Sequence, residues 1–200
     1  MTTLLLIRHA HTDAIGQSLS GWMPGWHLNS KGKQEAERLS ESLANFPLAA
    51  IYTSPLERAI ETAEPIARRR GIEPRTVEDL GEFRMGEWEG RSFAELAGQA
   101  QWVAFNQSRS SVRPPGGELM IECQTRMVRS VEQLALKHPE QTIAIVSHGD
   151  PIRSLLSYFL GAPIDLLQRF DISPASISVV QVASWGPRIL CMNRTEAWPA

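Results

Sequence analysis

The sequence contains few cysteines, only Cys123 and Cys191 among 200 residues. They lie far apart and form no Cys-x-x-Cys pair, so neither a disulfide framework nor a zinc site of usual spacing is expected. No apolar run approaches the roughly 20 residues that a membrane-spanning helix needs, and the run at residues 4–7 ends in charge. We therefore expect a cytoplasmic protein without membrane contact.

The sequence also lacks an excess of positive charge. Its 20 lysines and arginines against 22 aspartates and glutamates leave a formal net charge of −2. Because surfaces that bind nucleic acids need a basic field, no nucleic-acid partner is expected. The longest basic run, at residues 68–70, falls at the end of a predicted helix, where it complements the helix dipole.

Apolar segments of strand and helix character alternate along the chain, and the length fits one domain, residues 1–200. This alternation favours a three-layer α/β/α fold with a mostly parallel central sheet and one antiparallel edge region. Strands are predicted at 3–7, 48–53, 75–77, 142–146, 176–182 and 189–192, the last two joined by a Gly186-Pro187 turn. Helices are predicted at 30–45, 55–70, 92–98, 99–107, 118–137 and 151–160.

Polar side chains follow three of the predicted strands. Arg8 and His9 end the first strand, Arg58 lies one turn into the helix after the second, and His148 and Gly149 follow the fourth. Ligands of open α/β sheets bind outside the carboxyl ends of the strands, so these residues are expected to converge. Two guanidinium and two imidazole groups suit a phosphate, and a helix N-terminus after Gly149 would add N–H donors.

A phosphoryl-transfer site also needs a nucleophile and a proton donor. The chain has no P-loop motif, no Cys-x5-Arg signature and no Asp/His cluster of metal-binding spacing. Histidine is then the strongest remaining nucleophile at neutral pH, and its Nε2 would form a phosphohistidine. A carboxylic acid would protonate the leaving alkoxide, and Glu82, Glu87 and Glu89 are the candidates. A bound phosphate would raise the pKa of such a carboxyl group.

Six ordered segments between residues 4 and 153 carry recognisable motifs. They are Leu6-Ile7-Arg8-His9-Ala10-x-Thr12, Leu28-Asn29-x-x-Gly32-x-x-x-Ala36, Thr53-Ser54-Pro55-Leu56-x-Arg58-Ala59, Leu80-x-Glu82-x-x-x-Gly86-x-Trp88-Glu89-Gly90, Pro115-Gly116-Gly117-Glu118 and Val146-Ser147-His148-Gly149-x-x-Ile152-Arg153. In this order the segments resemble the histidine phosphatase superfamily, also called phosphoglycerate mutase-like. The resemblance implies the fold of that superfamily and no metal or organic cofactor.

The resemblance also implies roles, residue by residue. His9 aligns with the phosphorylated nucleophile, and Glu82 with the proton donor that later acts as base for the attacking water. The implied phosphate pocket and substrate contacts are Arg8, Arg58, His148, Gly149, Thr12, Ser20 and Gly21.

Four positions depart from the pattern of the family. Ala10 replaces the usual glycine beside the nucleophile, and His11 stands where relatives often have glutamate or glutamine. Glu35 stands in place of glutamine, and Ile15 in place of a common asparagine. Activity is expected to survive, because both histidines, both arginines and Glu82 are present. One contact to phosphate or substrate would be lost or supplied elsewhere.

The segment at residues 79–117 is expected to form a short lid over the site. Glu82 and Glu118 are only 36 positions apart (118 − 82), whereas mutases of the superfamily usually carry a longer insert with paired arginines. A short lid admits water, which hydrolyses a phosphohistidine. The resemblance therefore implies a metal-independent phosphatase of small-molecule phosphomonoesters, most similar to α-ribazole-phosphatase-type and broad-specificity members.

Two alternatives stay open: phosphoglycerate mutase-type phosphoryl transfer and a non-catalytic phosphate-binding protein on the same fold. Ala10 is the only support for the second, since a binding module needs neither a nucleophile nor an acid. A homodimer is also open, because the sequence does not show which apolar face is exposed.

Overall fold

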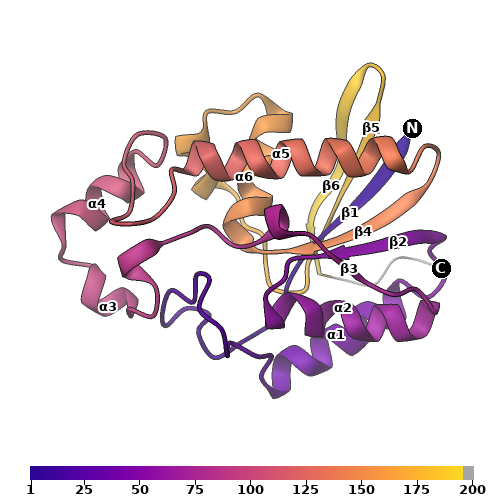
Figure 1. The fold of residues 1–200 in the computed structure, drawn as a ribbon, viewed down its shortest axis with the longest axis horizontal. Coiled ribbons are helices and arrows are strands. Elements are labelled where there is room, and N and C mark those ends of the chain that lie inside the picture. Colours follow the sequence, from indigo (N-terminus) through magenta and orange to yellow (C-terminus); the bar gives the residue numbers. More distant parts are fainter. Residues whose placement is uncertain (196–200) are drawn as a thin grey trace.

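The computed structural model describes residues 1–195, which form a central sheet with helices on both faces (Figure 1). The order of the six strands is β3-β2-β4-β1-β5-β6. β1 pairs in parallel with β4, β4 with β2, and β2 with β3, whereas β5 runs antiparallel to β1 and β6 antiparallel to β5. The strands are β1 Thr2–Arg8, β2 Leu48–Thr53, β3 Arg75–Thr76, β4 Thr142–Ser147, β5 Ile177–Ala183 and β6 Gly186–Arg194.

Alternate side chains of the strands enter two separate cores. Leu4 and Leu6 of β1 pack toward helices α5 and α6, while Leu5 and Ile7 pack toward α1 and α2. Residues 4–7 of β1 are therefore fully buried on both faces of the sheet, which explains their continuous apolar sequence. The helices are α1 Ser30–Ser42 and α2 Glu57–Arg70 on one face, and α5 Met120–Lys137 and α6 Gly149–Leu160 on the other.

Local sequence signals account for the ends of several helices. The Asn29 side chain caps α1 by accepting a hydrogen bond from the Gly32 amide at 2.9 Å. Gly71 ends α2 in the left-handed conformation, with φ of 64°, directly after the three arginines. α6 begins at Gly149 immediately after β4, so its first turn lies at the carboxyl end of the sheet.

Residues 83–119 form a lobe at one end of the sheet, on the left in Figure 1. The lobe has its own apolar cluster, in which Phe83, Trp88 and Phe105 meet, with Phe83 and Phe105 stacked at a centroid distance of 5.7 Å. Met120 of α5 and Leu167 join this cluster and attach the lobe to the body of the protein. Its short helices are η2 Gly86–Trp88, α3 Phe93–Leu96 and α4 Ala100–Gln107. Two further short helices lie outside the lobe: η1 Glu78–Leu80, whose Leu80 packs in the core beneath α5, and η3 Ile164–Arg169, which follows α6.

The three-layer α/β/α fold with a mostly parallel sheet is confirmed, but the predicted turn between the last two strands was wrong. Gly186 and Pro187 belong to β6, where they pair with Ala183 and Val182. The turn comprises residues 184–185. Proline is tolerated here because β6 is the edge strand of the sheet formed by residues 1–195. Within the described range, no helix has both the length and the apolar character needed to cross a bilayer.

Candidate active site

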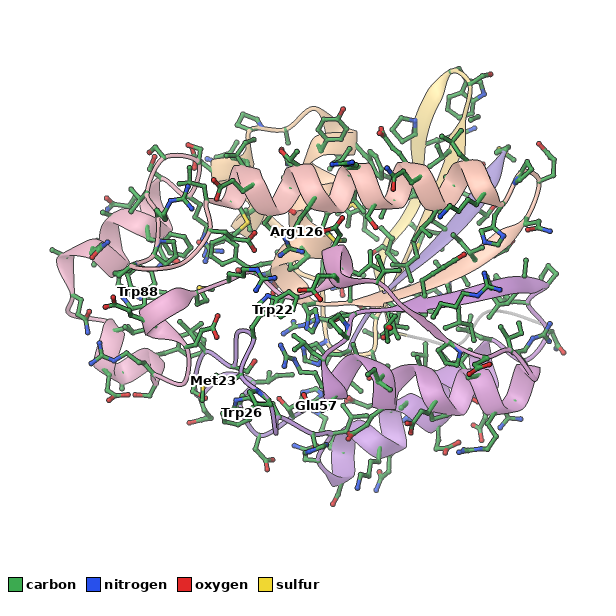
Figure 2. The ribbon with its side chains drawn as sticks, in the orientation of Figure 1. Trp22, Met23, Trp26, Glu57, Trp88 and Arg126 are labelled. Atoms are coloured by element: carbon green, nitrogen blue, oxygen red, sulfur yellow. The ribbon has the colours of Figure 1, made fainter. Side chains whose placement is uncertain are left out.

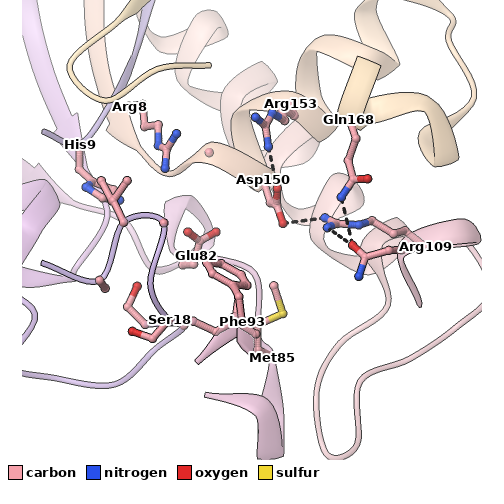
Figure 3. A pocket seen from close by; sticks show the side chains of 18 of the residues that line it. Arg8, His9, Ser18, Glu82, Met85, Phe93, Arg109, Asp150, Arg153 and Gln168 are labelled. Atoms are coloured by element: carbon pink, nitrogen blue, oxygen red, sulfur yellow. Dashed lines mark hydrogen bonds and ion pairs between the residues drawn. The ribbon is translucent and has the colours of Figure 1, made fainter. Parts of the chain in front are cut away.

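The carboxyl ends of β1 and β4 and the start of α2 bring the predicted residues together. His9, Glu82 and His148 place one ring nitrogen or carboxylate oxygen each within 4.8 Å of one another. The imidazole rings of His9 and His148 lie with centroids 5.1 Å apart and are tilted by 59°. Arg8 and Glu82 face the same pocket as His9 (Figure 3).

His9 is buried, and the backbone carbonyl of the next residue orients its ring. Its Nδ1 lies 2.8 Å from the Ala10 carbonyl oxygen. Because a carbonyl only accepts, Nδ1 carries the proton and Nε2 keeps a free lone pair. Burial, followed by the nearby charges of Arg58 and Arg8, holds the pKa of His9 well below its ordinary value. His9 is therefore neutral at physiological pH, as a nitrogen nucleophile must be.

His148 is fully buried between the end of β4 and the start of α6. Its Nε2 lies 2.7 Å from the Ser54 hydroxyl, and its Nδ1 lies 3.8 Å from Glu82 Oε2. Burial, and then the charge of Arg58, also holds the pKa of His148 well below its ordinary value. Among residues 1–195, Nδ1 of His148 has no hydrogen-bond partner.

Arg8 and Arg58 carry buried N–H groups that no described residue accepts. Arg58 is fully buried and donates from Nη2 to the Gly21 carbonyl at 2.8 Å, while its Nε and Nη1 are without a partner in residues 1–195. Arg8 donates from Nη1 to the Ile172 carbonyl at 2.6 Å and leaves Nε unpartnered. Unpaired buried cationic donors are costly, so this arrangement is built to receive an anion.

Glu82 supplies a carboxyl group with an unusual proton affinity. Burial, and then the negative charge of Asp150, raises the pKa of Glu82 to about 7, against the opposing effect of Arg58 and Arg8. The Phe83 amide donates to Glu82 Oε1 at 2.8 Å and fixes the orientation of the side chain. A carboxyl group with this pKa can both donate and accept a proton near neutral pH.

The pocket has a volume of about 300 Å³. Its inner end holds Arg8, His9 and Gly149, and a Cβ at position 149 would lie 3.3 Å from the Arg8 guanidinium. Glycine therefore lets the arginine lie against the first turn of α6, where unpaired helix N–H groups favour an anion. The outer end combines apolar with polar side chains, namely Leu19, Met85, Phe93, Trp102, Asn106, Arg109, Asp150, Arg153 and Gln168.

The outer polar residues are an ion-paired group that the sequence interpretation missed. Arg109 of the lobe donates to Asp150 of α6 at 2.8 Å, and Asp150 also faces Arg153 at 3.5 Å, as Figure 3 shows. Asp150 directly follows Gly149 in the last motif, and this position was the one sequence feature that could have placed it near the site. Arg109 comes from an irregular segment and gave no such signal.

The further predicted contacts are only partly brought together. Ser20 and Gly21 line the pocket, and the Gly21 carbonyl is occupied by Arg58. Thr12 is buried and does not line the pocket, although its hydroxyl has no partner in the described chain. Arg58 and His148 are not among the residues that line the pocket.

The departures from the family pattern are accommodated without strain. Ala10 has no positive φ, and its methyl group packs with Leu28 and Ala36, so it neither strains the backbone nor narrows the pocket. Glu35 accepts hydrogen bonds from His11, from the amide at 3.1 Å and from Nδ1 at 2.7 Å. Ile15 lines the pocket.

Two histidines and a carboxylate are also a set that could ligate a metal ion. The guanidinium groups of Arg8 and Arg58 are close enough to shift the pKa of both His9 and Glu82. Their positive charge opposes a cation at this position and favours an anion. The donor set therefore fits a phosphate group better than a metal ion.

Comparison with known proteins gives a consistent match. The family model described as the histidine phosphatase superfamily (branch 1) matches residues 4–195. The chain is 29% identical over 202 residues to phosphoserine phosphatase 1 of Hydrogenobacter thermophilus, covering 98% of this chain and 93% of that protein. It is 26% identical over 198 residues to the adenosylcobalamin/alpha-ribazole phosphatase of Salmonella typhimurium, covering 98% of each.

A solved structure and longer relatives complete the comparison. The structure of YhfR from Bacillus stearothermophilus superposes with a TM-score of 0.92 at 31% identity, covering 97% of this chain and 98% of that one. Three mycobacterial relatives are 32% identical over 201 residues. The chain spans about half of their length (54%).

Proposed function

The chain belongs to the histidine phosphatase superfamily (branch 1), and on this basis we propose that it is a metal-independent phosphatase of small-molecule phosphomonoesters. The observation that carries the proposal is the pairing of a neutral, oriented His9 with buried, unpartnered nitrogen atoms on Arg8, Arg58 and His148. The arginine N–H groups can donate to phosphoryl oxygens, and so can His148 Nδ1 when its Nε2 accepts from the Ser54 hydroxyl. The phosphatases among its relatives, which are named for phosphoserine and alpha-ribazole, support the same class of substrate.

In the first step His9 Nε2 attacks phosphorus while the ester P–O bond breaks. The leaving oxygen takes a proton from the protonated carboxyl group of Glu82, whose pKa of about 7 suits this role. The Ala10 carbonyl accepts from Nδ1 and stabilises the positive charge that develops on the ring. Arg8, Arg58 and His148 hold the phosphoryl oxygens, and the products are a phosphohistidine and a free alcohol.

In the second step water attacks the phosphohistidine. The Glu82 carboxylate takes a proton from the water, the P–N bond breaks, and inorganic phosphate leaves. His9 returns to its neutral form and Glu82 to its protonated form. Residues 79–117 would act as the lid over this pocket, through Met85, Phe93 and Trp102 on its outer side.

Phosphate release from a panel of phosphomonoesters, measured with EDTA for the wild type and for His9→Ala, tests the proposal. We expect EDTA-resistant release by the wild type and none by the variant. Release that EDTA abolishes, or that persists in His9→Ala, would overturn it. Activity only on phosphoglycerate with a bisphosphate primer would instead favour mutase-type transfer.

A cytoplasmic location is part of the same proposal, since Cys123 and Cys191 are both free thiols. Pairing into a homodimer stays a prediction, and light scattering of the purified protein decides it.

A further inference from the structure

A buried ion pair lies next to the proposed acid but outside the pocket. Arg126 of α5 donates to both oxygens of Glu118, from Nη2 at 2.6 Å and from Nε at 3.1 Å. The two side chains are only 15% and 11% exposed, and neither lines the pocket. Figure 2 shows Arg126 below α5, on the side toward Trp22. The proposed mechanism gives this pair no role.

Arg126 also donates hydrogen bonds to the backbone segment that carries Glu82. Nη1 donates to the Asp79 carbonyl at 2.7 Å and to the Gly81 carbonyl at 2.8 Å. Nη2 donates to the carbonyl of Glu82 itself at 2.8 Å. One guanidinium group therefore binds three carbonyls within four residues as well as both oxygens of Glu118, which is more acceptors than the three N–H groups of a lysine ammonium can serve.

Other contacts complete the support of this segment. Glu118 accepts from the Arg84 amide at 2.9 Å, two residues after Glu82, and its own amide donates to the Arg84 carbonyl at 3.0 Å. The indole N–H of Trp22 also donates to the Glu82 carbonyl. The ring of Trp22 lies so close to Gly81 that a Cβ there would be 2.2 Å from it.

This support matters because residues 81–85 belong to neither a helix nor a strand. No regular backbone ladder fixes the position of Glu82, and side chains from α5 and the lobe do so instead. A proton donor must lie within hydrogen-bond reach of the leaving oxygen, and a shift of about 1 Å can cost roughly 100-fold in rate.

We propose that Arg126 and Glu118 are positioning residues that hold the carboxyl group of Glu82 against the leaving oxygen of the substrate. The proposal rests on the proposed phosphatase function. It predicts a selective defect, because only substrates with a poor leaving group need the proton. An alkyl phosphate releases an alkoxide that must be protonated, whereas 4-nitrophenyl phosphate releases a stable phenolate.

The test compares kcat/KM for an alkyl phosphate and for 4-nitrophenyl phosphate in Arg126→Lys. This variant keeps the positive charge but loses the planar guanidinium group with its several N–H donors. kcat/KM reports the steps up to phosphoryl transfer to His9, so the later attack of water does not blur the comparison. We expect a loss of about 10- to 100-fold for the alkyl ester and less than about 3-fold for the aryl ester.

Arg113→Lys is the matched control. Arg113 forms a similar two-oxygen ion pair with Glu122 of α5, at 2.7 Å for both contacts, but it is half exposed and donates no hydrogen bond to residues 79–82. The ratio of the two kcat/KM values is expected to stay at the wild-type level in this variant.

Glu118→Gln is the second variant, in case Arg126→Lys does not fold. It keeps an oxygen for the Arg84 amide and removes the charge that faces Arg126, so the same selective loss is expected at smaller size. Equal losses on both esters in a folded variant, or no loss, would overturn the positioning role. A wild type without His9-dependent phosphatase activity would instead overturn the proposed function on which it rests.

Discussion

The two sides of the pocket are built in different ways. On the phosphate side, Arg8 and His9 end a strand that is hydrogen-bonded on both edges, and His148 joins β4 to α6. On the acid side, Glu82 lies in an irregular segment that is held by side chains, chiefly Arg126. The position of the phosphate donors is thus set by the sheet, and that of the proton donor by a few long-range polar contacts.

Because the two sides are built differently, substitutions on them should have different effects on activity. The phosphate is common to every substrate, so the sheet side can be rigid and general. The acid side also carries residues of the lobe that line the pocket, such as Phe93 and Trp102. Variants should therefore affect all substrates equally on the first side and discriminate between substrates on the second.

Glu82→Gln should give the largest selective effect. The amide cannot donate the required proton, so kcat/KM for an alkyl phosphate should fall by about 10²- to 10⁴-fold, with a much smaller fall for 4-nitrophenyl phosphate. Steady-state kinetics on both esters measure it, and Glu87→Gln, at an exposed position three residues before Gly90, is the control. A selective loss in the control rather than in Glu82→Gln would move the acid role to Glu87.

Arg58→Met should give a large effect without selectivity. It removes a buried cation on the phosphate side, so kcat/KM should fall by about 10²- to 10³-fold for both esters. Without ligand the variant should be at least as heat-stable as the wild type, because the two unpartnered Arg58 donors are costly to bury. Thermal melts with and without phosphate check this, and stabilisation by phosphate that survives the substitution would contradict it.

Asp150→Asn should shift the pH profile with a smaller effect on rate. The negative charge of Asp150 is second only to burial in raising the pKa of Glu82. The first step needs protonated Glu82, so kcat/KM for an alkyl ester falls as the pH rises through this pKa. Without the charge the pKa is lower, and the fall should begin at a lower pH.

The matched control is Asp165→Asn. It removes the charge of a second aspartate that hydrogen-bonds to the lobe, at Ser110 next to Arg109. Asp165 accepts hydrogen bonds from the Ser110 amide and hydroxyl, both at 2.7 Å, and does not line the pocket. For Asp165→Asn, the fall of kcat/KM at alkaline pH should begin at the same pH as in the wild type. A shift toward higher pH in Asp150→Asn would refute the electrostatic account of Glu82.

Ala10→Gly should have the smallest effect. The methyl group of Ala10 packs with Leu28 and Ala36 away from the pocket, so kcat/KM should change by less than about 2-fold. Lost packing and a freer unfolded chain should lower the free energy of unfolding by about 1 kcal/mol. Urea unfolding measures the stability, and a large gain in activity would show that Ala10 obstructs the nucleophile.

The sequence predicted the body of the protein better than the lobe, for a physical reason. Apolar periodicity predicts strands such as 142–147 and helices such as 120–137, because each buries a continuous face in a core. The convergence of Arg8, Arg58 and His148 followed from the same strands. The position of Glu82 did not, and its choice over Glu87 and Glu89 came from the family resemblance.

Contacts between distant residues were beyond the local pattern. Arg109 and Asp150 are 41 positions apart and meet only because the lobe folds back over α6. The hydrogen bond from Arg126 to the Glu82 carbonyl joins residues that are 44 positions apart in the sequence. Neither residue type nor spacing predicts such pairs, since arginines on helices are usually solvated. The misplaced turn at Gly186-Pro187 has a simpler cause, because an edge strand tolerates residues that usually mark turns.

The central claim is that His9 is the residue that carries the phosphoryl group. The most direct measurement is rapid quenching of the enzyme with an excess of substrate, followed by mass spectrometry of its peptides under alkaline conditions. The account predicts an acid-labile phosphoryl group on the peptide that contains His9, absent from His9→Asn. A phosphoryl group on any other residue, or turnover without any phosphorylated enzyme, would contradict it.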